Sequence, residues 1–238
     1  MRATLAIAGR EYRAFFQMPL GWIIVALCLL GSGYAFASST VTPGQPATLR
    51  EFFGFWWFLL ALIAPAISMR LFSEELRSGT FEPLMSSPVS EVGIVLGKYL
   101  GAVALLLTCL APTLGYVAVL EWLSRPDYGP ILTGYLGVLL TGMLYLAAGT
   151  LFSALTSSQT LAFLASLGVM VGLEVAVGQG ASHLPPKLAL VAEKLSVNAR
   201  IADFAAGVLD TSHVAFFVVV SAWLLVLCAL ALRARRWR

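Results

Sequence analysis

The sequence predicts an all-α polytopic membrane protein with six transmembrane helices. Of its 238 residues, 59% are hydrophobic and only 11% are charged, and the mean hydropathy is +0.88. A soluble domain carries about 25% charged residues. The apolar residues are also gathered into stretches that approach the ~20 residues needed to cross ~30 Å of hydrocarbon. A chain this apolar cannot bury its side chains in one soluble core, so lipid must cover much of its surface.

Six apolar stretches qualify as membrane spans, and each is expected to be helical because lipid offers no partner to open backbone groups. They cover residues 20–39, 52–72, 94–122, 131–155, 160–177 and 214–232. Only a short polar turn, 156–159, separates the fourth span from the fifth, so this pair is the least distinct. Pro65 and Pro112 are expected to bend the second and third spans, because proline removes a backbone donor and clashes with the preceding turn.

The basic residues indicate the orientation of these spans. With the N-terminus in the cytoplasm, the inner side holds ten of the 15 Lys and Arg residues and the outer side holds five. An even number of spans then returns the C-terminus to the cytoplasm. The segment from Leu20 to Ala37 also resembles a secretory signal with an A-x-A site. Its apolar run is long enough to span, which favours a retained helix.

Residues 1–19 form a separate N-terminal element before the 20–238 transmembrane domain. Apolar side chains follow helical spacing on one side of this element, with polar ones roughly opposite. The apolar set is Leu5, Ala8, Tyr12, Phe15 and Phe16, and the polar set is Arg2, Arg13 and Gln17. This pattern predicts an interfacial helix on the inner membrane surface, separated from the first span by a break at Pro19 and Gly21.

The loop between the second and third spans, residues 70–93, is the longest on the cytoplasmic side. Apolar residues recur through it, which is unusual for a solvated linker. Thr80 is positioned to cap a short helix over 81–86, Pro88 would end that helix, and Ser90 would cap the third span. Exposed apolar residues on a short cytoplasmic helix indicate a docking surface, although an ordinary solvated loop is the alternative.

On the opposite side, residues 180–213 are predicted to form an outer segment of one or two helices. His183 and His213 border it, but two histidines this far apart do not predict a metal site. Within the membrane, Gly93, Gly97 and Gly101 recur at every fourth residue, which predicts a close helix contact. Glu174 is the acid well inside a span, so it is expected either to face a cavity on a substrate route or to reach the membrane interface.

The sequence lacks the motifs of several other classes. It has no Walker A sequence, no His-Glu-x-x-His and no Gly-x-Ser-x-Gly, so neither ATP hydrolysis by the chain itself nor a familiar enzyme mechanism is predicted. The net charge of +3, without a basic run on a soluble domain, gives no reason to expect nucleic acid binding. The three cysteines lie in apolar stretches and are read as small apolar residues.

Two stretches resemble a known family. FSEELRSGTFEPLMSSPVS at 72–90, followed by IVLGKYL at 94–100, resembles the signature of ABC-2 type ABC transporter permeases. Within that family it is most similar to the branch of the gliding-motility permease and the nitrous oxide reductase maturation permease. LSVNARIADFAAGVLD at 195–210 resembles the outer segment of that branch, with Ser196, Phe204, Gly207 and Asp210 in matching places.

The resemblance implies a permease subunit in a bacterial inner membrane. Two permease chains, identical or different, would pair, and two separate ATPase subunits would bind ATP and Mg and dock below. The 70–93 loop would carry the coupling helix. Its coupling residues would be Glu74, Glu75, Arg77, Gly79, Thr80, Phe81, Glu82 and Pro88. The substrate is open, and relatives mostly export.

Three other functions remain as alternatives at this point. A non-transporting scaffold or assembly subunit of a motility or maturation apparatus would share the same spans. An ion-coupled secondary transporter would be expected to hold several intramembrane acids or an inverted repeat, and the sequence offers one such acid and no convincing repeat. A membrane enzyme would need a nucleophile–base or metal motif.

Overall fold

The computed structural model describes residues 2–40, 48–80, 89–124, 126–178 and 196–236, and within them the regular structure is entirely helical. The helices are α1 (Arg2–Gln17), α2 (Pro19–Thr40), α3 (Arg50–Ser68), α4 (Ser73–Ser78), α6 (Glu91–Leu110), the 3₁₀ segment η1 (Ala111–Thr113), α7 (Leu114–Leu123), α8 (Tyr128–Leu155), α9 (Gln159–Gly178), α11 (Val197–Ala205) and α12 (Thr211–Arg236). The predicted fold class is confirmed.

The expected spans correspond to helices in the structure, but not all are equally long. In the described residues, five helical stretches are long and apolar enough to cross a membrane: Pro19–Ser39, Arg50–Ser78, Glu91–Leu123, Tyr128–Leu155 and Thr211–Arg235. The expected fifth span corresponds to α9, whose apolar part, Gln159–Val175, belongs to a shorter class. Helix α9 as a whole has 20 residues, so at 1.5 Å per residue it reaches about 30 Å, the thickness of the hydrocarbon core.

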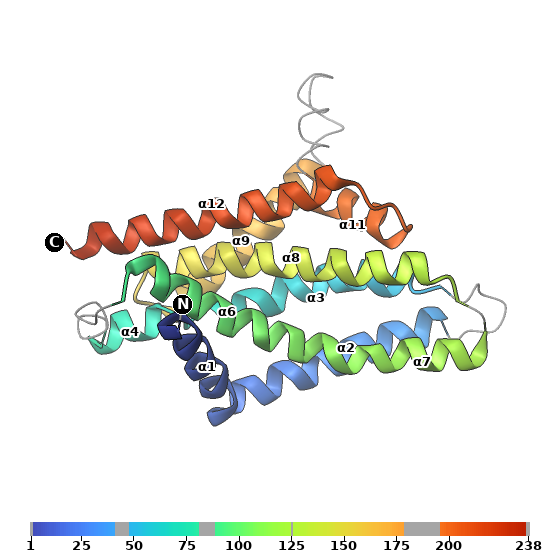
Figure 1. Cartoon of the computed structure of the whole chain (residues 1–238), viewed down its shortest axis with the longest axis horizontal. Coiled ribbons are helices and arrows are strands. Elements are labelled where there is room, and N and C mark those ends of the chain that lie inside the picture. The colour runs from blue at the N-terminus through green and yellow to red at the C-terminus, as the bar shows by residue number, and fades with distance from the viewer. Residues whose placement is uncertain (1, 41–47, 81–88, 125, 179–195, 237–238) are drawn as a thin grey trace, which may run out of the picture.

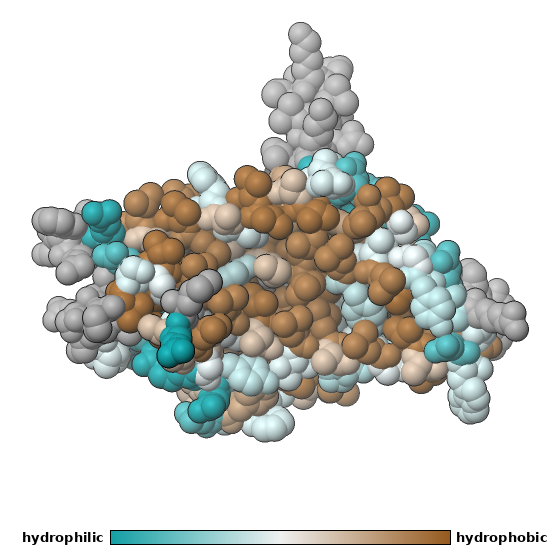
Figure 2. All heavy atoms as spheres, in the orientation of Figure 1, coloured by the Kyte–Doolittle hydropathy of each residue, from teal (hydrophilic) through white to brown (hydrophobic). Residues whose placement is uncertain are grey.

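The long helices lie roughly side by side, with a different set of short elements at each end (Figure 1). One end holds α4, the start of α6 and the C-terminal part of α12, and we call it the α4 end. The other holds α11 and the α7–α8 connection, and we call it the α11 end. Figure 2 shows a broad apolar surface between the two ends and polar residues gathered toward them. That distribution is typical of a protein embedded in a bilayer.

Helix α8 lies at the centre of the bundle. It packs against α3, α6, α9, α11 and α12, and 67% of its apolar stretch is buried within the chain, against 28% for α12. Close packing depends on small residues, because a Cβ at Gly134 would lie 2.2 Å from the Phe53 ring. In lipid, such close approach supplies van der Waals contact where the hydrophobic effect between helices is absent.

The third expected span is interrupted where proline predicts a bend. Helix α6 ends at Leu110, Pro112 lies in η1, and α7 continues from Leu114. By contrast, Pro65 lies inside α3, which continues to Ser68. The Ser90 cap predicted for the third span is confirmed, since its Oγ accepts from the backbone N–H of Gly93 at 3.2 Å.

Helix α1 is separate from α2, because the helical structure is interrupted at Met18 before α2 begins at Pro19. It lies at an angle to the main bundle in Figure 1. Its buried side differs from the predicted apolar side at one position: Leu5 is 65% exposed. The face toward α6 instead includes Thr4, Ile7 and Glu11. Tertiary packing on α6, rather than apolarity, decides which side of α1 is covered.

Candidate functional site: the junction at the α4 end

The candidate site lies around α4, between the second and third spans. Of the eight residues expected to couple to a partner, five are described: Glu74, Glu75, Arg77, Gly79 and Thr80. Phe81, Glu82 and Pro88, with the short helix expected over 81–86, lie outside the described residues. We refer to α4, its preceding turn and the side chains that hold them as the α4 junction.

Local sequence explains why α4 forms and where it ends. Glu74 and Glu75 lie in its first turn and Arg77 in its last, which complements the helix dipole at both ends. Gly79 has φ +72°, a left-handed conformation that favours glycine, and it terminates the helix. Arg77, Gly79 and Thr80 are exposed. These three residues are therefore accessible to a partner.

Helix α4 has no side-chain cap of its own. Its start is held instead by a residue of α8. The hydroxyl of Ser153, on α8, accepts from the backbone N–H of Phe72 at 3.0 Å and from that of Ser73 at 3.1 Å. The same hydroxyl donates to the carbonyl of Met69 at 2.9 Å. Ser153 is fully buried. One serine on a different span thus satisfies the turn between α3 and α4.

The two adjacent glutamates of α4 have different surroundings. Glu74 is 46% exposed at its side chain and pairs with Arg70 at 3.2 Å, one turn earlier. Glu75 is 19% exposed and lies against Lys98 of α6, with 2.9 Å between Oε1 and Nζ. From the sequence, both glutamates are predicted to contact the ATPase partner. In the structure only Glu74 remains available for one.

Lys98 is the centre of a buried ionic cluster. Its side chain is 2% exposed, and its Nζ lies 2.9 Å from Oε1 of Glu11 and 2.9 Å from Oε1 of Glu75. Arg10 lies 3.2 Å from Glu11 and 3.8 Å from Glu75, which balances the charge at two cations and two carboxylates. The Phe72 ring centroid lies 5.3 Å from Nζ. An ammonium enclosed in this way needs its partners, because an unpaired buried charge is costly.

The glycine row brings α1 close enough to join this cluster. A Cβ at Gly97 would lie 2.8 Å from Cβ of Ile7 and 2.9 Å from the Thr4 carbonyl, and a Cβ at Gly101 would lie 2.7 Å from Cβ of Glu11. The helix that approaches this row is therefore α1. Without side chains on the row, Glu11 can reach Lys98, which lies between the two glycines in the sequence.

A second contact joins the α3–α4 turn to the end of α1. Arg70 Nη2 lies 2.8 Å from Sδ of Met18, and its guanidinium carbon lies 5.7 Å from the centroid of the Phe15 ring. Arg70 also pairs with Glu74. One arginine therefore connects the first turn of α4 to the break between α1 and α2.

Sequence reasoning missed the residues at the centre of the α4 junction, namely Lys98, Glu11 and Ser153. A signal was available for Lys98, since it is a charge inside an apolar stretch and therefore requires a partner. Its partners are separated from it by 87 and 23 positions in the chain, so spacing alone could not identify them. Ser153 offered no comparable signal among the many small residues of α8.

At the α11 end, Glu174 lies where α9 meets the start of α11. It is 9% exposed, and its Oε1 accepts from the Ser196 hydroxyl at 3.0 Å and from the backbone N–H of Asn198 at 3.2 Å. Ser196 also caps α11 by accepting from the backbone N–H of Ala199 at 3.2 Å. The carboxylate therefore anchors the N-terminal end of α11, where the helix dipole favours negative charge.

The borders of the outer segment are held by short-range polar contacts. The backbone N–H of Ser212 donates to Asp210 at 2.7 Å, and this bond lowers the pKa of the Asp210 carboxyl. His213 lies 3.8 Å from Asp203, whereas His183 lies outside the described residues. Within the described residues, no cluster of three or more His, Cys, Asp or Glu side chains could hold a metal ion.

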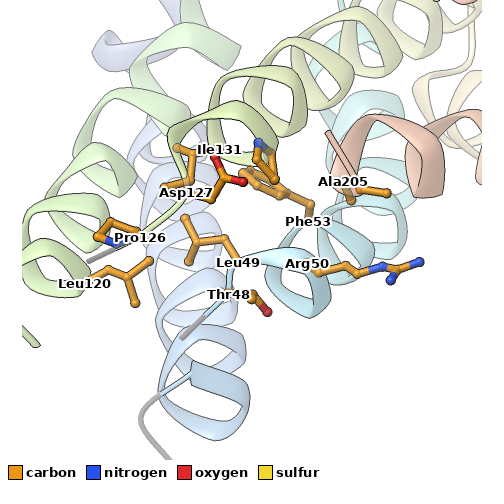
Figure 3. A pocket seen from close by; sticks show the side chains of 11 residues that line it. Thr48, Leu49, Arg50, Phe53, Leu120, Pro126, Asp127, Ile131 and Ala205 are labelled. Atoms are coloured by element: carbon orange, nitrogen blue, oxygen red, sulfur yellow. The ribbon is translucent and has the colours of Figure 1, made fainter. Parts of the chain in front are cut away.

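A small cavity of about 210 Å³ opens at the same end, between α3, α7, α8 and α11. Its lining includes Leu49, Phe53, Leu120 and Ile131, and the carboxylate of Asp127 points toward it (Figure 3). Asp127 also accepts from the backbone N–H of Gly129 at 3.0 Å as the cap of α8. The side chain of Arg50 extends away from the cavity centre in Figure 3. The carboxylate of Asp127 therefore serves as a helix cap at the wall of this cavity.

Fold and site together define a multi-pass α-helical membrane protein with a polar helix held at one end of its bundle. The family follows from comparison with family models: residues 5–237 match the model described as ABC-2 family transporter protein. The match covers nearly the whole chain, so the protein belongs to the ABC-2 transporter family, whose members are membrane components of transporters. No curated protein sequence matches the chain.

Proposed function

We propose that the chain is the membrane-spanning permease subunit of an ABC transporter and that a separate ATPase subunit acts on the α4 junction. Family membership provides the class of protein. The observation that supports the α4 junction as the point of action is its double attachment. Ser153 fastens it to α8, and Lys98 fastens it to α6 and, through Glu11, to α1. A force applied there reaches both sides of the bundle.

The surface offered to the ATPase is the outward side of α4. The described part of it contains Glu74, Arg77 and Thr80. Phe81, Glu82 and Pro88 lie outside the described residues, and they are included in the proposal on the family resemblance alone. Glu75 belongs to the inner side and serves to hold α4 in place. Docking and anchoring are thus assigned to different residues of one short helix.

The mechanism follows from this division of roles. ATP and Mg bind to the ATPase, and its closure and reopening displace α4. Because α4 is tied to α8 on one side and to α6 on the other, its displacement changes the relation between spans. The ATPase can favour one arrangement only if it contacts the two arrangements differently. Because α4 moves between the two arrangements, the ATPase contacts it differently in each.

The remaining features of the proposal rest on the sequence. They are pairing with a second permease chain, placement in a bacterial inner membrane with both termini in the cytoplasm, an interfacial position for α1, and export as the direction. The narrower resemblance to the gliding-motility and nitrous oxide reductase branch rests on the 72–100 and 195–210 stretches alone. Glu174 is retained as a candidate for the substrate route through its burial in α9.

Capture of the ATPase tests this function directly. The tagged chain is purified from native membranes in mild detergent, and co-purifying nucleotide-hydrolysing chains are identified and assayed. Glu74→Arg should reduce capture because it reverses an exposed charge on the proposed docking surface. Arg50→Glu, an exposed charge reversal at the α11 end, is the matched control and should leave capture unchanged.

Three outcomes would contradict the proposal. The first is the absence of any nucleotide-hydrolysing partner, and the second is full capture by Glu74→Arg combined with Arg77→Glu. The third is a stable complex whose ATPase activity never responds to the permease, which would favour a scaffold or assembly subunit.

A further inference from the structure

The ionic cluster at the α4 junction joins three elements that are distant in the sequence. Lys98 comes from α6, Glu11 from α1 and Glu75 from α4. Helix α4 itself packs on α8 and α9, while α1 packs along α6. The side chains of this cluster therefore connect α1 to a helix that lies against a different part of the bundle.

We propose that Lys98 is a positioning residue that binds α4 and α1 into one body with the start of α6, so that the ATPase moves the three together. This inference rests on the proposed function, because the ATPase supplies the displacement of α4. It adds α1 to the unit that moves with α4. It also assigns Lys98, which lies away from the docking surface, the role of connecting α1 to α4.

The burial of Lys98 is the physical reason for the connection. Its ammonium group makes its two ion pairs at 2.9 Å, one to each carboxylate, and its side chain is 2% exposed. If α4 moved away from α1, one carboxylate would leave and the ammonium would keep a single ion-pair partner. Removing one partner of a buried ion pair is strongly unfavourable. Moving α1, α4 and Lys98 together avoids that loss.

Two further contacts limit separate movement. Arg70, in the turn before α4, contacts Phe15 in the last turn of α1 and Met18 just after that helix. The glycine row holds α1 against α6, and the hydroxyls of Tyr12 and Thr108 lie 3.0 Å apart further along the same contact. Helix α1 is therefore attached to α6 along its length and to the α4 junction at two places.

Distance measurements by pulsed spin-label spectroscopy test the inference in the complex with the ATPase. One label pair, Gly9→Cys with Ser78→Cys, reports on α1 and α4, since both positions are exposed and a Cβ at Gly9 meets open space. A second pair, Ser78→Cys with Arg233→Cys, reports on α4 relative to α12. Each pair is measured without nucleotide and with ATP and vanadate.

The expected result is that nucleotide changes the second distance but not the first. Glu75→Gln, which removes the α4 carboxylate while Glu11 still pairs with Lys98, should broaden the α1–α4 distance distribution and make it depend on nucleotide. Glu51→Gln is the control, since it neutralises an exposed glutamate in the first turn of α3 at the α11 end and should leave the α1–α4 distance as in the unmodified chain. Thermal stability is recorded for every variant.

Two results would overturn the inference. One is an α1–α4 distance that already changes with nucleotide in the unmodified chain. The other is a Glu75→Gln variant that loses thermal stability while its α1–α4 distances match the unmodified chain, which would make the cluster a fold-stabilising feature only. If no ATPase binds, or the α4–α12 distance ignores nucleotide, the proposed function fails instead. The width of the α1–α4 distribution without nucleotide then still decides whether the cluster joins the two helices.

Discussion

Replacing Gly97 with alanine gives the sharpest test of how α1 is held. The added Cβ would lie 2.8 Å from Cβ of Ile7 and 2.9 Å from the carbonyl oxygen of Thr4. Carbon atoms in contact normally lie ~3.5–4.0 Å apart, so α1 must move outward by ~0.7–1.2 Å. Neither contacted atom can rotate away. The Thr4 oxygen belongs to the backbone, and the Ile7 Cβ is bonded directly to the backbone Cα of its own residue.

The magnitude follows from two opposing effects. Overpacking costs ~1–3 kcal/mol, and the fixed position of both contacted atoms favours the upper end of that range. Alanine regains ~1 kcal/mol over glycine in a helix interior. The net loss for the α1–α6 contact is therefore about 2 kcal/mol, which corresponds to a factor of about 30 in the opening equilibrium of α1.

Hydrogen exchange of the α1 amides measures this loss. In the Gly97→Ala variant they should exchange about 30-fold faster under conditions where reclosing is faster than chemical exchange, so that the rate follows the opening equilibrium. The α8 amides should be unaffected. Gly9→Ala is the matched control, because a Cβ there meets nothing within 4 Å. Its exchange should be unchanged or slower. Equal exchange in the Gly97→Ala and Gly9→Ala variants would refute the close contact between α1 and the glycine row.

Two more predictions concern the polar contacts at the two ends. Ser153→Ala removes the hydroxyl that accepts from the backbone N–H groups of Phe72 and Ser73, so it should destabilise the α4 junction by ~1–3 kcal/mol and speed hydrogen exchange of the α4 amides. Ser157→Ala, at an exposed position, is the control and should leave that exchange unchanged. Equal α4 exchange in the two variants would contradict the role of Ser153. Glu174→Ala removes the anchor of α11 and should cost about 1 kcal/mol there by analogy with a lost cap. Glu174→Gln, which keeps one acceptor, should lose less, and α11 exchange as in the unmodified chain in both would contradict the anchoring contact.

Much of the architecture is predictable because a bilayer leaves few choices. A long apolar stretch must become a helix that satisfies its own backbone, so five of the six expected spans are long helices with nearly the expected bounds. Local signals also worked where a single residue decides the outcome. Ser90 caps α6, Pro112 interrupts the third span, and the chain breaks at Met18 just before Pro19.

The α4 junction was less predictable because neighbours in the sequence take opposite roles. Glu74 and Glu75 carry the same charge at successive positions, yet successive residues of a helix point in directions that differ by ~100°. One therefore remains at the surface, and the other pairs with Lys98. Glu174 shows the same difficulty, since its acidity suggested a route or an interface, and its partners belong to a helix that begins over twenty residues later.

The sequence by itself determined that this protein is embedded in a membrane, roughly where its long apolar helices lie, and that the glycine row would admit a close neighbour. Only the tertiary structure decided that this neighbour is α1, that Leu5 lies outside its contact face, and that Lys98 collects carboxylates from two other helices. The reason is physical. Hydropathy and capping act between residues a few positions apart, whereas the partner of a buried charge is chosen by how whole helices pack.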